Sequence, residues 1–216
     1  MMSNQSIWAG ARILRRLACS GVALAFLSIP AQAQTSASAQ DFVQADIQTG
    51  VSILQDKSLS ADARRQQLHD FLLSLLDTRR IAIYTLGSAQ SASPTDLDAM
   101  FDAFRDFMGA TYNSRLGSYG GQTLKITDTV EHAPGDFVVR TILIDPSDPP
   151  GANPTEVDLR VVDESGKFYI VDAHIEGIWL AEALRDDFQG FLKEHNGDIA
   201  ALTAHLRELA VTLKGT

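Results

Sequence analysis

The stretch from residue 166 to residue 188 constrains the fold most, because it joins a strand pattern directly to a helix pattern. Residues 168–176 are predicted to form a strand, in which successive side chains point to opposite faces. One face then carries Phe168, Ile170, Asp172, His174 and Glu176, and the other carries Tyr169, Val171, Ala173 and Ile175. Gly177 ends this pattern, and apolar residues recur at helical spacing from Leu180 to Phe191. We therefore expect a strand that turns at a glycine into an amphipathic helix.

The rest of the chain separates into helical and strand-like parts. Helical periodicity covers residues 41–56, 60–76, 78–86 and 94–119, where cap residues and Ser93-Pro94 mark helix starts. Alternation predicts strands over residues 122–127, 136–144 and 155–162, before the strand at 168–176. Two helices are expected after it. This order indicates an α+β fold, with N-terminal helices packed on a curved four-stranded antiparallel sheet and further helices at the C-terminus.

The N-terminus has the features of a secretory signal peptide. Arg12, Arg15 and Arg16 precede a short apolar run, and Ala31-Gln32-Ala33 is a small-residue cleavage site. We expect residues 1–33 to be cleaved, residues 34–40 to form a flexible leader, and residues 41–216 to form a single domain. The mature chain would then be exported and free of cysteine, since Cys19 lies in the removed segment.

The charge of the mature chain argues against several partners. Of 18 basic and 27 acidic residues, three basic ones and no acidic one fall in residues 1–33, which leaves 15 against 27 and a formal charge of −12. An acidic protein is a poor electrostatic match for nucleic acid or anionic membrane surfaces, so no nucleic-acid partner is expected. A basic protein surface would suit it.

Few residues are arranged for catalysis or metal binding. Asp172, His174 and Glu176 share one predicted strand face, but neighbours there lie about 7 Å apart, so pairing with Arg140 and Arg160 of adjacent strands is the favoured interpretation. The other histidines show no zinc-binding spacing, and no G-x-S-x-G motif is present. No metal, cofactor or catalytic group is therefore predicted. The aromatic and methionine stripe of residues 101–112 fits either core packing or the wall of an apolar pocket.

Several motifs resemble the MlaC-type, or toluene-tolerance, family of periplasmic lipid-binding proteins. They include Ile81-Ala82-Ile83-Tyr84-Thr85-Leu86-Gly87 and the helix from Phe101 that ends in Tyr119-x-Gly121-Gln122. The pattern of Gly166, Phe168, Ile170 and Asp172, followed by Ile175-Glu176-Gly177, Leu180, Arg185 and Phe188, is the most specific. The resemblance covers nearly all of the mature chain. Ser88-Ala89-Gln90, Trp179 and the long 145–154 loop depart from the family pattern.

The resemblance implies a periplasmic, non-enzymatic lipid carrier that acts as a monomer. It would hold phospholipid acyl chains in an apolar cavity and shuttle lipid between membrane complexes, in support of outer-membrane lipid asymmetry. The implied partners are an inner-membrane MCE, permease and ATPase complex and an outer-membrane lipoprotein complex. A hopanoid or other polycyclic lipid is the alternative cargo. The expected cavity residues are Leu72, Leu75, Ile83, Tyr84, Phe101, Phe104, Met108, Tyr112, Val139, Val157, Leu159, Val171, Ile175 and Ile178.

Two other classes of function remain open at this stage. The order of helices and strands also resembles the nuclear-transport-factor-2 fold, on which a small-molecule enzyme would use Asp172 as a general base and Tyr84 or Tyr112 as a hydrogen-bond donor. A structural adaptor would instead have a filled core and no sizeable cavity.

Overall fold

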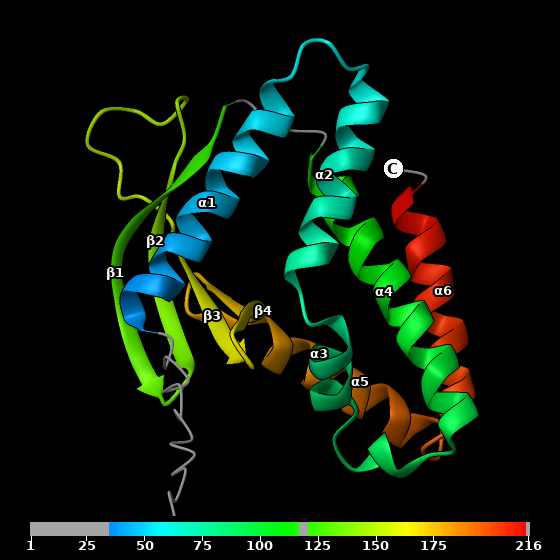
Figure 1. Ribbon diagram of the computed structural model, residues 1–216. Coiled ribbons are helices and arrows are strands. Elements are labelled where there is room, and N and C mark those ends of the chain that lie inside the picture. The colour runs from blue at the N-terminus through cyan, green and yellow to red at the C-terminus, as the bar shows by residue number, and fades with distance from the viewer. Residues whose placement is uncertain (1–34, 117–120, 215–216) are drawn as a thin grey trace, which may run out of the picture. The chain divides into compact units, whose positions relative to one another are not determined.

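The structure is a computed structural model that describes residues 35–116 and 121–214. The predicted signal peptide and the predicted helix end at residues 117–119 lie outside these ranges, as does the side chain of Tyr112. The described elements belong to one compact unit, Ala33–Thr216. They are α1 (Ser36–Gln55), α2 (Ala61–Leu75), α3 (Thr78–Leu86), the 3₁₀ turn η1 (Gly87–Ser91), α4 (Pro94–Leu116), β1 (Thr123–Ala133), β2 (Asp136–Ile144), β3 (Glu156–Glu164), β4 (Lys167–Ile175), β5 (Ile178–Trp179), α5 (Leu180–Glu194) and α6 (Ile199–Lys214) (Figure 1).

Side-chain caps set the starts of the first four helices. Thr35, Ser60, Asp77 and Ser93 each accept a hydrogen bond from the backbone N–H three residues later, at 2.9–3.2 Å. Because Thr35 caps α1, this helix begins at Ser36, within the segment that the sequence analysis assigned to a leader.

The five strands form one antiparallel sheet in the order β1-β2-β3-β4-β5. The α+β class is confirmed, and the sheet has one more strand than expected. Glu176 and Gly177 both have positive φ, 51° and 88°, as in the two-residue turns that fold a strand back on itself. The chain therefore forms β5 against the end of β4 before α5 begins.

A bulge in β4 changes which residues share a face. Val161 of β3 lies opposite Ile170, and the next β3 residue, Arg160, lies opposite Asp172, so Val171 is the extra residue. Ile170 therefore shares its face with Ala173 and Ile175. The predicted unbroken alternation, with Ile170 on the face of Asp172, is wrong because it assumed a regular strand.

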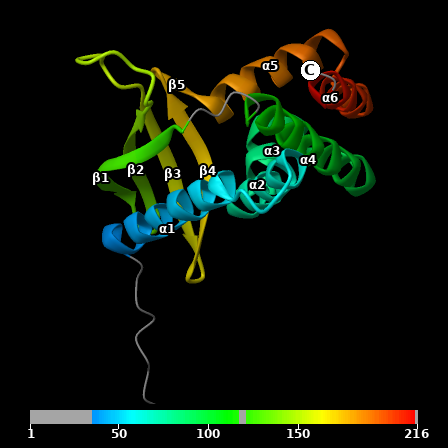
Figure 2. The ribbon, with the colours of Figure 1, turned by 90° about the horizontal axis from the view of Figure 1, so that it is seen from above.

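Helix α1 covers one face of the sheet (Figure 2). Its residues Ala39 and Val43 are buried against Phe137, Val139 and Val161 of β2 and β3. Strands β2 and β3 thus present apolar side chains to α1, as is usual for an antiparallel sheet that is covered on one face.

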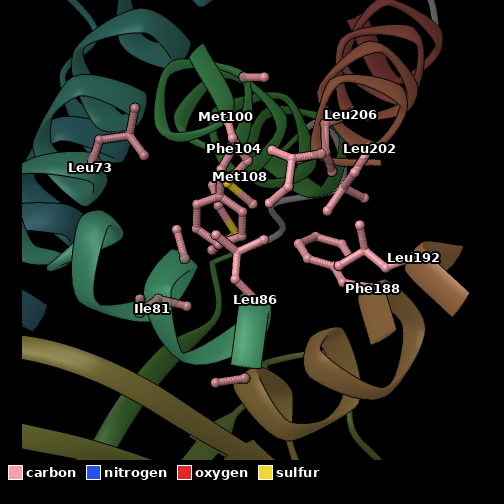
Figure 3. Close-up of a cluster of buried hydrophobic side chains, with 14 residues drawn as sticks. Leu73, Ile81, Leu86, Met100, Phe104, Met108, Phe188, Leu192, Leu202 and Leu206 are labelled. Carbon is pink, nitrogen blue, oxygen red and sulfur yellow. The ribbon is translucent and has the colours of Figure 1, made fainter. Parts of the chain in front are cut away.

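A second core holds the helices α2 to α6 together (Figure 3). Met100 and Phe104 of α4 pack with Leu202 and Leu206 of α6, and all four are fully buried. Phe104 also meets Phe188 of α5 edge to face, with ring centroids 6.1 Å apart. This layer joins the sheet at β4, where the Asp77 N–H donates to the Ile170 carbonyl at 3.2 Å.

Candidate functional site: an apolar cavity between helices and sheet

A cavity of about 400 Å³ lies between α1, α2 and the sheet. Helices α3, α4 and α5 contribute a few further wall residues. Apart from Gly50, only four of the lining residues within 35–116 and 121–214 are not apolar, namely Asp46, Gln122, Thr123 and Asp172. Its volume falls within the range of about 300–1,000 Å³ that is usual for small-molecule sites. The arrangement can hold an apolar molecule away from water.

Helix α1 forms one wall of the cavity. Its lining residues recur at helical spacing on one side, and they are Val43, Asp46, Ile47, Gly50, Val51 and Leu54. Gly50 faces α2: a Cβ atom there would lie 3.7 Å from Phe71 Cε1 and 3.8 Å from Leu68 Cδ1. The glycine thus leaves open space on the cavity side of α1.

The opposite wall comes from the sheet, mainly from β4. The bulge at Val171 lets five nearly consecutive residues border the cavity, namely Ile170, Val171, Asp172, Ala173 and Ile175. Leu159 of β3, opposite Ala173, extends this wall. A regular strand would have presented only every second residue.

The structure places six of the fourteen residues predicted from the sequence on the cavity wall. These are Leu72, Leu75, Met108, Leu159, Val171 and Ile175. They come from α2, α4, β3 and β4, so the structure brings together side chains far apart in the chain.

Four predicted residues lie elsewhere in the protein interior or the sheet. Phe104 belongs to the helical core, and Phe101 packs on its edge beneath the Arg79 guanidinium, 4.2 Å from the ring centroid. Val139 is fully buried under α1. Val157 pairs with Ile175 across β3 and β4 without bordering the cavity.

Three further predicted residues are partly exposed to solvent: Ile83, Tyr84 and Ile178, with exposed fractions of 37%, 44% and 56%. Helix α3 turns Ile81 toward the cavity instead of Ile83. The Arg185 guanidinium lies over the Tyr84 ring, 4.9 Å from its centroid. Tyr112 is part of α4, and its side chain is outside the described residues.

No residue of α1 was among the predicted cavity residues, although α1 supplies a whole wall. The signal for it was present: Val43, Ile47, Val51 and Leu54 are spaced as one helical stripe. Ile170, which belongs to the family pattern, and Phe71 of α2 also border the cavity without having been named as cavity residues.

Two carboxylates border this apolar space, and burial raises the pKa of both. The pKa of Asp46 rises from 3.8 to about 6, and one of its oxygens, Oδ2, is buried without a hydrogen-bond partner. Burial also raises the pKa of Asp172, but the Oδ1 atom of Asp172 accepts hydrogen bonds from the backbone N–H groups of Ala173 and Ala181, at 2.8 and 2.9 Å. Asp172 thereby fixes the start of α5 beside β4.

A second, polar pocket of about 290 Å³ shares Ile81, Val171, Asp172 and Ala181 with the apolar cavity. It also contains Arg80, Tyr84, Asp136 and Arg160. Arg160 donates to both carboxylate oxygens of Asp136, at 3.0 and 2.6 Å, and Arg80 pairs with Glu164. Both arginines thus have acidic partners.

The predicted polar face of β4 has a different set of partners from those expected. Arg160 lies opposite Asp172 in the sheet but bonds to Asp136, and Arg140 lies near Asp128, at 3.8 Å. His174 lies 3.7 Å from Asp158 and packs on Trp179. Within residues 35–116 and 121–214, no group of three His, Cys, Asp or Glu residues is placed to hold a metal ion.

Comparisons with known proteins match this architecture. The model of the family described as "MlaC protein" matches residues 44–208. Among solved structures, the chain is similar to the phospholipid-binding protein from Ralstonia solanacearum in complex with a phospholipid, with a TM-score of 0.69 and 21% sequence identity. That match covers 81% of this chain and 98% of the other, and at this identity it shows a shared fold.

Proposed function

The chain belongs to the MlaC family, and from this premise we propose that it is a lipid carrier that holds phospholipid acyl chains in the cavity between α1, α2 and the sheet. The observation that carries this proposal is the cavity itself, about 400 Å³ with almost wholly apolar walls. The solved protein that shares the fold is described as phospholipid-binding and was obtained with a phospholipid.

The volume of the cavity sets the size of its cargo. An engineered apolar cavity of about 150 Å³ accommodates benzene, so about 400 Å³ has room for roughly 16 carbon atoms. At about 0.8 kcal/mol for each buried methylene, their transfer from water contributes about 13 kcal/mol before the costs of association. This is enough to hold one long acyl chain, and a second chain requires the walls to separate.

We further propose that the protein works in the periplasm. Residues 1–33 have the pattern of a signal peptide, and no helix in the described part of the chain is both long and apolar enough to cross a membrane. The carrier would exchange lipid with an inner-membrane MCE, permease and ATPase complex and with an outer-membrane lipoprotein complex. The acidic chain, with a formal charge of −9 before processing, would dock on basic surfaces of these partners.

Burial and release of a lipid need no catalytic group, so the proposed carrier is not an enzyme. The enzyme hypothesis used Asp172 as a base near Tyr84, and both residues do border the polar pocket. The hydrogen bonds from Ala173 and Ala181 give Asp172 a structural role at the start of α5. This role accounts for the residue without a reaction.

The test is to identify what the protein carries when purified from periplasm in its native state. Solvent extraction and mass spectrometry should find about one diacyl phospholipid for each folded chain. A polycyclic lipid in its place would favour the hopanoid alternative within the same carrier function. Folded protein without any lipid would overturn the proposal.

A further inference from the structure

One end of the apolar cavity is closed by residues that also belong to the core of helices α2 to α6. Ile81 of α3, Met108 of α4 and Ala181 of α5 are buried, line the cavity and pack in that core. The other two buried residues on the described part of the wall, Val43 and Leu68, belong to the sides formed by α1 and α2. Because a lipid keeps its polar headgroup in water, its acyl chain points away from solvent and ends against the buried residues of α3, α4 and α5.

Met108 is the residue at this end that reaches the cavity with a long, adaptable side chain. Ala181 has no side-chain atom beyond Cβ, and Ile81 is β-branched and therefore stiff at χ1. Methionine is unbranched and fills irregular space between packed elements. In the core around Met108 lie Phe104 and Leu86, which are fully buried (Figure 3). The Met108 side chain thus forms the boundary between the open cavity and the close-packed core.

The residue next to Met108 holds the backbone of α4 in place. Gly109 is buried, and a Cβ atom there would overlap Nε2 of the His69 side chain on α2. Helices α2 and α4 therefore approach this closely only because residue 109 is a glycine. Since the two helices are fixed against each other at this point, the depth of the cavity depends on the length of the side chain at position 108.

We propose that the Met108 side chain sets the longest acyl chain that the cavity accepts. A benzene-sized cavity of about 150 Å³ gives a scale of about 25 Å³ for each carbon, so the cavity of about 400 Å³ has room for roughly 16 carbons. A longer chain leaves its extra methylenes in water, and each of them lowers the affinity about four-fold. This inference rests on the proposed carrier function and adds a chain-length limit to it.

Two substitutions of Met108 should move this limit in opposite directions. Met108→Ala removes Cγ, Sδ and Cε of the side chain, which on the same scale makes room for about three more carbons. Met108→Phe adds about as many heavy atoms and takes a similar volume away. Met108→Leu is the matched control, because an exchange of methionine for leucine conserves the volume of the side chain and is usually well tolerated.

Competitive loading measures the limit. Delipidated protein is incubated with vesicles of equimolar phosphatidylcholines whose monounsaturated chains have 14, 16 or 18 carbons, and the bound lipids are quantified by mass spectrometry. In Met108→Ala the bound ratio of the 18-carbon to the 16-carbon lipid should rise about ten-fold over the wild type. In Met108→Phe the ratio of the 16-carbon to the 14-carbon lipid should fall about ten-fold, and Met108→Leu should give the wild-type ratios.

Circular dichroism verifies the fold of each variant. If Met108→Ala does not fold, the comparison of Met108→Phe with Met108→Leu decides the question. Wild-type ratios in a folded Met108→Phe variant would overturn the chain-length inference and leave the carrier function intact. Failure of the wild type to load any of the three lipids would overturn the carrier function and this inference with it.

Discussion

Gly50→Phe tests whether the space beside α1 is the lipid site. A ring at this position must occupy the cavity, because the Cβ position already touches Phe71 and Leu68 of α2 at 3.7 and 3.8 Å. A cavity of about 150 Å³ accommodates benzene, so a phenyl ring fills about 150 Å³ of the roughly 400 Å³ available here and displaces about six carbons of an acyl chain. Burial of these six carbons contributes about 5 kcal/mol of transfer free energy, which the variant loses. Even if only half of this loss reduces the binding free energy, the affinity falls by nearly two orders of magnitude.

The assay is displacement of a fluorescent phospholipid from delipidated protein, with circular dichroism to verify the fold. Two variants serve as controls. Gly190→Phe makes the same exchange on α5, where a Cβ meets nothing within 4 Å, and should bind as the wild type does. Gly50→Ala should also keep binding while it stabilises α1 by about 0.5–1 kcal/mol, since alanine is the better helix former. Wild-type affinity in a folded Gly50→Phe variant would refute the assignment of the site.

Three further substitutions test the roles assigned to Phe104, Asp46 and Asp172. Phe104→Ala should lower the free energy of unfolding by about 3–5 kcal/mol in urea titrations, because it empties part of the helical core. Lipid loading of the folded fraction should stay as in the wild type. A selective loss of lipid loading would place Phe104 in the binding site. Asp46→Leu should stabilise the protein by about 1 kcal/mol more at pH 8 than at pH 4. Because burial raises the pKa of Asp46 to about 6, the protonated carboxyl group favours the folded state below about pH 4, and this contribution to stability is lost as the pH rises through about 6. The full effect would be about 3 kcal/mol, and solvent screening at this half-exposed side chain reduces it. A pH-independent difference would contradict that burial. Asp172→Ala should lower the free energy of unfolding by about 1 kcal/mol through loss of the hydrogen bond from the Ala181 N–H, and thermal unfolding equal to the wild type would show that this hydrogen bond contributes little.

Hydrophobic periodicity was sufficient to predict most elements of the fold. Helix α3 matches its predicted bounds, and β2 matches its predicted range. Strand β1 extends to Ala133, well past the predicted end, because its polar half keeps pairing with β2 across a register shift after Ile126. Pairing of this kind depends on a neighbouring strand, which local alternation does not show.

The wall of the cavity was harder to predict than the fold. The bulge at Val171 arises from register with β3, and the sequence of β4 alone has no glycine or other mark of it. The stripe on α4 was assigned to the cavity, but Phe104 faces α5 and α6 because those helices bury it more completely. Met108, one turn later on the same helix, does reach the cavity.

The location of the acyl chain is the central claim, and photo-crosslinking tests it most directly. A phospholipid that carries a diazirine in one acyl chain is loaded into the unmodified protein and irradiated, and the adducts are mapped by peptide mass spectrometry. We expect adducts on α1, α2 and β4, at residues such as Val51, Leu72 and Ile175. Adducts concentrated on the exposed face of α6, where Val211 is 71% exposed, would contradict it.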